Sequence, residues 1–234
     1  MATIKPALIE EVAEAAQTFW EKKLTPGMDS GDLSLKDPET SLIYILPQPS
    51  ERQPIHGWNT ITAADVAVID MQGNVVGPPE NLPTVEYPMH LRIYEARPDV
   101  NAIVHSHGLW SQIFAAVRQD IPCLTIDAYH FLLGEVKCAE FGRVGSEALA
   151  ENIVEALGNE RRAALMAGHG AACVGPNFYE AFLAAEVLEM TAKQALYAKL
   201  IKGKIVPVTL GDILTEDIVK AMDAETLKQM NIKF

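Results

Sequence analysis

Apolar residues recur along the chain with two different periods, one typical of helices and one of buried strands. Between residues 6 and 23 they recur every three to four positions, which predicts an amphipathic opening helix. The same spacing predicts helices over residues 85–95, 109–117, 146–157 and 178–201. Short apolar runs predict strands over residues 42–46, 67–70, 75–76, 102–104, 121–126 and 163–167, a strand within 131–139, and extended chain over 171–175.

Helices and strands alternate along the chain, and no Pro-, Gly- or Ser-rich linker separates two patterned halves. Turn-forming and polar residues predict loops over residues 25–34 and 50–62. The pattern therefore predicts one α/β domain over residues 1–234, with a mixed sheet and helices on its faces. From about residue 213, a tail rich in Leu, Ile and Met is expected to form short helices.

The composition excludes several classes of partner. The net charge is −12, and no cluster of Lys or Arg is longer than a pair, which argues against binding to nucleic acid or an anionic membrane. No apolar run reaches the length of a membrane helix, and the first residues lack the basic flank and apolar core of a signal peptide. Cys123, Cys138 and Cys173 are widely spaced among apolar neighbours and are expected to be reduced core residues. We therefore expect a cytoplasmic protein.

The end of the strand over residues 102–104 carries two candidate metal ligands. His105 and His107 are two residues apart, so in an extended segment both imidazoles point to one face and Ser106 to the other. Neutral imidazole is a good ligand for zinc and related ions. The alternative is that the two histidines only cap the strand end.

A third candidate ligand is His169, which lies between Gly168 and Gly170 after the strand over residues 163–167. Glycines on both sides allow a close approach of the backbone and leave the imidazole free to project. Three imidazoles with an open position are typical of a catalytic zinc site.

Glu86 opens the helix that precedes the histidine strand, and His90 lies one turn further along the same face. A carboxylate at this position can complement the helix macrodipole, but it can also serve as the proton carrier that a metal-polarised substrate needs. His90 is either a packing or orienting residue or a direct participant.

These residues occur in an order that resembles the signature of the class II aldolase/adducin family. The matching residues are Glu86, His90, Tyr94, Arg97-Pro-Asp99, His105-Ser-His107, Ile121-Pro122 and Gly168-His-Gly170. The resemblance implies a three-layer α/β/α sandwich around a mixed, largely antiparallel sheet. It also implies a homotetramer with the active site at a subunit interface, where C-terminal residues of a neighbour contribute.

Position by position, the resemblance implies that His105, His107 and His169 bind a divalent ion, most commonly Zn²⁺, with Mn²⁺, Co²⁺ and Fe²⁺ as alternatives. It assigns Glu86 as the acid/base carboxylate. It also places the segment from Gly31 through Asp32 to Ser34 in the substrate loop.

The chain departs from the family where phosphate is bound. Thr84 and Val85 stand in place of a pair of serines, and valine has no hydrogen-bonding side chain. Gln48 lies between two prolines in place of a glycine-containing loop, and proline offers no N–H. Asp32 replaces an asparagine and adds a negative charge. A substrate without phosphate, or one anchored differently, is therefore an open alternative.

The resemblance implies a metal-dependent lyase that cleaves a C–C bond through an enediolate, acting as an aldolase on a sugar or sugar-phosphate-like ketose. The first alternative is a decarboxylase of a hydroxy-aromatic or keto acid, in which His130 would contact a carboxylate; otherwise His130 is a core or interface residue. The second is a non-catalytic, adducin-like binding protein. The expected substrate contacts are Gly31, Asp32, Ser34, Gln48, Thr84 and His130, whereas His56 is expected to be a surface residue.

Overall fold

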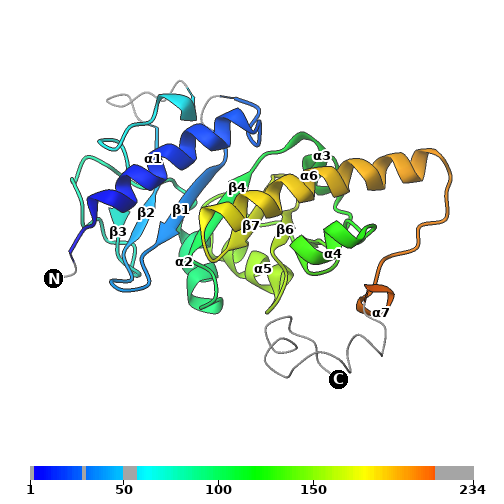
Figure 1. Ribbon diagram of the computed structural model, residues 1–234. Helices are drawn as coiled ribbons and strands as arrows, with labels where there is room; N and C mark the ends of the chain where they lie inside the picture. The colour runs from blue at the N-terminus through cyan, green and yellow to red at the C-terminus, as the bar shows by residue number, and fades with distance from the viewer. Residues whose placement is uncertain (1–2, 28–29, 50–56, 214–234) are drawn as a thin grey trace.

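A seven-stranded sheet forms the centre of the protein (Figure 1). The computed structural model describes residues 3–27, 30–49 and 57–213. The strands lie in the order β3-β2-β1-β4-β7-β6-β5, and every neighbouring pair is antiparallel except β5 and β6. Their bounds are β1 Asp32–Lys36, β2 Ile43–Ile45, β3 Ala67–Ile69, β4 Ala102–Ser106, β5 Lys137–Ala139, β6 Ala163–Met166 and β7 Ala171–Gly175. The sheet is therefore mixed and largely antiparallel, as predicted.

Helices cover both faces of this sheet. One apolar core lies under α1 (Pro6–Glu21), α3 (Leu109–Val117), α4 (Ile126–Leu132) and α6 (Phe178–Leu200). The other lies under α2 (Tyr87–Ala96) and α5 (Glu147–Leu157). Figure 1 shows α1 and α6 crossing in front of the strands. The predicted three-layer α/β/α sandwich is confirmed; a 3₁₀ helix, η1 (Trp58–Thr60), and a short helix, α7 (Leu210–Ile213), complete the described elements.

The central strands read as continuous apolar runs because successive side chains enter different cores. In β4, Ala102 and Val104 contact the core under α1 and α6, whereas Ile103 contacts the core under α2 and α5. This alternation determines which way the end of the strand points: His105 continues the face of Ile103, toward α2.

Several predicted elements are confirmed with their local causes. The helix over residues 109–117 has the predicted bounds. The Ser146 side chain accepts a hydrogen bond from the Leu149 N–H and caps α5, which ends at Leu157 as predicted. All three cysteines are free.

The predicted strand over residues 121–126 is wrong. Only Ile121 pairs, through an isolated bridge to Val136, and Pro122 has no N–H to continue a ladder. The Thr125 side chain accepts from the Ala128 N–H, so the chain turns into α4 at residue 126. In the next segment, only residues 137–139 form the strand expected within 131–139.

The predicted loop over residues 25–34 is wrong at its end, where residues 32–34 form the start of β1. Leu33 and Leu35 alternate with polar residues, and pairing on both sides with β2 and β4 makes this segment a central strand. The predicted strand at residues 75–76 is reduced to a bridge between Val75 and Ile69. His56 and the tail beyond Ile213 lie outside the described residues.

No helix within the described ranges is long and apolar enough to cross a membrane.

Candidate metal and acid–base site

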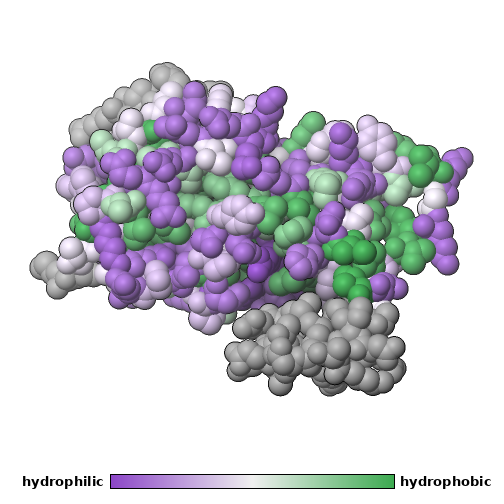
Figure 2. Space-filling model, viewed as in Figure 1, coloured by the Kyte–Doolittle hydropathy of each residue, from purple (hydrophilic) through white to green (hydrophobic). Residues whose placement is uncertain are grey.

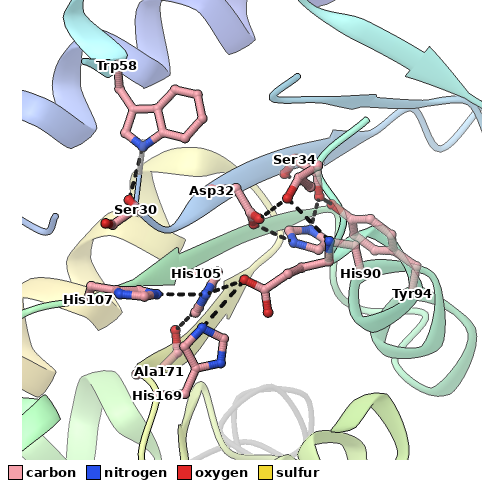
Figure 3. A network of polar contacts seen from close by, with 12 residues as sticks. Ser30, Asp32, Ser34, Trp58, His90, Tyr94, His105, His107, His169 and Ala171 are labelled. Atoms are coloured by element: carbon pink, nitrogen blue, oxygen red, sulfur yellow. Dashed lines mark hydrogen bonds and ion pairs between the residues drawn. The ribbon is translucent and has the colours of Figure 1, made fainter. Parts of the chain in front are cut away.

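Strand β4 delivers two imidazoles to one edge of the sheet. His105 is fully buried on the face toward α2, and His107 follows directly after the strand, where its backbone N–H donates to the Leu24 carbonyl at 2.8 Å. Ser106 is buried and its side chain lies beside Cys173, a residue of the opposite core, as the period of two predicted. Figure 3 shows the rings of His105 and His107 side by side.

The turn between β6 and β7 brings His169 to the same place. Because β7 is antiparallel to β4, with Ser106 opposite Ala171, the start of β7 meets the end of the histidine strand. Gly168 has a φ of +64°, a conformation that favours glycine. Gly170 has no room for a side chain, since a Cβ there would lie 2.5 Å from the Ser106 carbonyl oxygen. The close approach expected from the flanking glycines therefore occurs at Gly170.

The three imidazoles form a compact cluster. Their ring centroids are 4.8, 4.9 and 4.9 Å apart, and one nitrogen of each lies within 4.8 Å of the others. The Nδ1–H of His105 donates to the Ala171 carbonyl at 3.0 Å, so its Nε2, 3.1 Å from His107 Nε2, is the atom that can bind a cation after losing its proton. Nitrogens bound tetrahedrally to one zinc ion are about 3.3 Å apart. The donor set therefore fits a divalent cation.

The electrostatics of the cluster also favour a cation. Burial lowers the pKa of His105, but the carboxylates of Glu86 and Asp32 outweigh this effect and raise that pKa to about 9. Burial and the charge on His105 lower the pKa of His107 to about 3, and they also lower the pKa of His169. Without a metal ion, the positive charge of the cluster therefore lies on His105, near the carboxylates of Glu86 and Asp32.

Glu86 lies against this cluster at the N-cap of α2. Its Oε2 is 3.0 Å from His105 Nε2 and 3.6 Å from His169 Nε2, while its Oε1 is buried without a hydrogen-bond partner. No side-chain cap of the helix is formed. The position of this carboxylate is therefore explained by its contacts with the histidines as well as by the helix macrodipole.

A buried polar network extends from Asp32 behind the histidines (Figure 3). One carboxylate oxygen of Asp32 is 2.8 Å from His90 Nε2, and the other accepts from the Thr84 hydroxyl at 2.6 Å. His90 Nδ1 lies 2.7 Å from Ser34 Oγ, which is 2.7 Å from the Tyr94 hydroxyl. Burial raises the pKa of Asp32, but His90 and Thr84 help to lower it to about 2. Asp32 is therefore a carboxylate, and the position of His90 supports an orienting role.

The structure separates the predicted substrate contacts into two groups. Gly31, Asp32, Gln48 and Thr84 line a cavity of about 390 Å³ together with Glu86 and His107. Ser34 and His130 are not among the described lining residues. The Ser34 side chain is used inside the network, and His130 is exposed on α4, edge-on to Phe131. A substrate contact by either residue within one chain is not supported by this placement.

Two features were missed from the sequence. The first is the link between Asp32 and Thr84; the second is Glu189 of α6, whose carboxylate accepts the N–H groups of Trp110 and Ser111, both at 2.8 Å. Glu189 thereby caps α3 directly after the histidine strand. The sequence indicates only part of this arrangement. Glu86, His90 and Tyr94 are four residues apart, which places them on one face of a helix.

Comparison with known proteins identifies relatives along most of the chain. A family model described as Class II Aldolase and Adducin N-terminal domain matches residues 10–196. The L-fuculose phosphate aldolase of Methanocaldococcus jannaschii is 31% identical over 193 residues, which are 82% of this chain and 98% of the relative. The 5-deoxy-D-ribulose 1-phosphate aldolase of Bacillus thuringiensis is 28% identical over 204 residues, 86% of this chain and 92% of the relative.

Solved structures agree. An L-fuculose 1-phosphate aldolase superposes with a TM-score of 0.81 at 30% identity, covering 97% of this chain and 99% of the other. A putative aldolase/epimerase/decarboxylase from Escherichia coli superposes with a TM-score of 0.75 at 24% identity, covering 89% and 96%, and supports the fold alone. The chain belongs to the class II aldolase and adducin N-terminal domain family.

Proposed function

We propose that the protein is a divalent-metal-dependent lyase of the aldolase type, which cleaves a C–C bond in a hydroxylated ketose. One observation carries the proposal: three imidazoles converge within 4.8 Å of one another, and the Glu86 carboxylate lies 3.0 Å from one of them. The aldolase names of the relatives support the same reaction class. A non-catalytic, adducin-like protein would have no need to retain both the ligand cluster and the carboxylate.

In this proposal the three histidines hold the cation through nitrogen atoms. The bound cation supplies a Lewis acid that polarises a substrate carbonyl. The Nδ1–H of His105 donates to the Ala171 carbonyl, which leaves Nε2 as the atom that would bind the cation, in exchange for its proton. Three imidazole donors suit Zn²⁺ best, with Mn²⁺, Co²⁺ and Fe²⁺ as alternatives.

Glu86 is assigned the proton transfer. In a retro-aldol cleavage a hydroxyl group loses its proton, the neighbouring C–C bond breaks, and the carbon next to the carbonyl later gains a proton. The Oε1 atom of Glu86 is buried beside the histidines without a partner, so it is available to accept a proton and return it. Its Oε2 lies 3.0 and 3.6 Å from the Nε2 atoms of His105 and His169, so the carboxylate is beside the position where these nitrogens would hold the cation.

Decarboxylation of a hydroxy-aromatic or keto acid is the second candidate, because one observation favours it. The cavity beside the histidines has no Lys or Arg among its described lining residues, and the Thr84 hydroxyl is already donated to Asp32. Such a cavity offers few partners to a phosphate group, so it favours a substrate without phosphate, such as a hydroxy-aromatic or keto acid. Release of CO₂ from an aromatic hydroxy diacid, without an aldehyde product from any ketose, would establish this alternative.

We further propose that the active unit is a homotetramer with the site at a subunit interface. Leu109, two residues after His107, is 65% exposed, and Ile201 after α6 is 78% exposed. Figure 2 shows apolar side chains gathered around the end of α6. Exposed apolar side chains of this kind support burial against a second copy of the chain. Light scattering coupled to size-exclusion chromatography tests the assembly.

The central experiment compares two variants of the metal-loaded enzyme. Glu86→Gln is expected to keep its metal but to lose about 10²–10⁴-fold in kcat, because an amide does not accept the proton. His107→Ala is expected to lose both metal and activity. Metal content by elemental analysis and aldehyde release from L-fuculose 1-phosphate and L-fuculose are the readouts. Normal turnover by Glu86→Gln would remove Glu86 from the mechanism.

A further inference from the structure

Two carboxylates lie on the wall of the cavity beside the histidines. Asp32 and Glu86 both line it, and none of its nine described lining residues is Lys or Arg. Any substrate arm that enters this cavity therefore meets two negative groups.

Three of the hydrogen-bond donors on the cavity wall are already used within the protein. The backbone N–H groups of Gln48 and Thr84 donate to the carbonyls of Leu82 and Leu46, at 2.8 and 2.9 Å. The Thr84 hydroxyl donates to Asp32. Pro49 has no N–H to offer. These three groups could therefore bind an anion only after their existing hydrogen bonds break.

The hydrogen bonds of Asp32 fix it as an acceptor. The Tyr94 hydroxyl donates to the Ser34 carbonyl at 3.1 Å. Ser34 Oγ can then donate to His90 Nδ1, and His90 Nε2–H together with Thr84 can donate to the two oxygens of Asp32. This arrangement gives every member of the chain a partner and leaves no proton on the Asp32 carboxylate. The side chain of Asp32 is 2% exposed, so it cannot rotate away from an incoming anion without breaking this network.

We infer that Asp32 is a specificity-determining residue, which disfavours a phosphate group in this cavity and selects a substrate arm that carries neutral hydroxyl groups. The inference rests on the proposed lyase function, whose substrate it narrows. A phosphate dianion beside Asp32 and Glu86 is repelled at short range in a partly desolvated site. A hydroxyl group instead donates to a carboxylate, because each carboxylate oxygen accepts more than one hydrogen bond.

The test measures binding of dihydroxyacetone and dihydroxyacetone phosphate to the metal-loaded enzyme by calorimetry. Both ligands present the same hydroxyketone, and they differ only in the phosphate on the second arm. We expect wild type to bind the unphosphorylated ketone at least as tightly, and Asp32→Asn to shift the ratio of dissociation constants toward the phosphate by about tenfold or more. The matched control is Asp37→Asn, which removes a carboxylate just after β1, outside the cavity, and leaves the ratio unchanged.

Two results would overturn the inference: a tighter complex with the phosphate in wild type, or an unchanged ratio in Asp32→Asn. If Asp32→Asn does not fold, the ratio of the two dissociation constants in wild type decides whether the cavity disfavours phosphate. Binding requires no turnover, so the proposed lyase function and the proposed role of Asp32 can be refuted independently. An enzyme that cleaves no ketose refutes the lyase function, whereas the ratio of dissociation constants still decides the role of Asp32.

Discussion

Replacing Gly170 by alanine is expected to weaken metal binding without unfolding the protein. A Cβ at this position would lie 2.5 Å from the Ser106 carbonyl oxygen, 3.0 Å from His107 Cδ2 and 3.1 Å from His105 Cε1. The φ of Gly170 is not in the left-handed region, so alanine acts here through contacts alone. The added methyl group therefore pushes on His105 of β4, on His107 directly after the strand, and on the backbone between them.

The size of the effect follows from these distances. Relieving the contact with Ser106 to an ordinary 3.4 Å requires a displacement of 3.4 − 2.5, or about 0.9 Å. Ligand distances in a metal site tolerate only about 0.2 Å. Even if the backbone absorbs most of the displacement, the remainder disturbs the ligand geometry, and we expect a loss of about 10–100-fold in metal affinity, comparable to loss of an outer-shell partner.

Gly168 provides the matched control, since it lies on the other side of His169. A Cβ there would meet nothing within 4 Å, but its φ of +64° disfavours alanine. Gly168→Ala should therefore cost about 1 kcal/mol of stability and leave metal affinity within a few-fold of wild type.

Competition with a chromogenic chelator measures the metal affinity of both variants, and urea denaturation of the metal-free proteins measures their stability. Wild-type affinity in Gly170→Ala would refute the reasoning, as would a larger loss of affinity in Gly168→Ala than in Gly170→Ala.

Three further predictions concern groups around the site. Tyr94→Phe removes the buried hydroxyl that contacts Ser34, and it should destabilise the fold by about 1–3 kcal/mol in urea denaturation; an unchanged midpoint would mean that the network adds no stability. Glu189→Ala leaves two N–H groups of α3 without their acceptor and should cost about 1–2 kcal/mol, with Glu189→Gln less affected; equal losses would contradict a role for the charge. The pKa of Asp37 is lowered, since a lysine ammonium, a threonine hydroxyl and a backbone N–H outweigh its burial. The stabilisation from Asp37 is therefore present above the unfolded pKa and is lost as pH falls through the folded value, so wild type should lose more stability than Asp37→Asn between about pH 6 and 3.

Much of the fold could be predicted because its causes are local. The helix over residues 109–117 follows from the spacing of its apolar residues, and α5 follows from its Ser146 cap. The central strands were recognisable as apolar runs because helices cover both faces of the sheet. The two errors have the opposite cause. The segment 121–126 is apolar but lacks a partner strand beyond one bridge, whereas β1 is a weak local pattern that two neighbouring strands stabilise.

For the site, the sequence by itself determined the identity of the candidate groups. A spacing of two residues places His105 and His107 on one face of a strand, and the glycines around His169 permit a close approach, whatever the rest of the fold does. Only the tertiary structure decided what surrounds them. Asp32 meets Thr84 and His90 across 52 and 58 residues of chain, so no local pattern shows that its carboxylate contacts a histidine and that the Thr84 hydroxyl is already used. Hydrogen bonds between distant segments depend on strand order and register, which arise from packing of the whole sheet rather than from any one stretch.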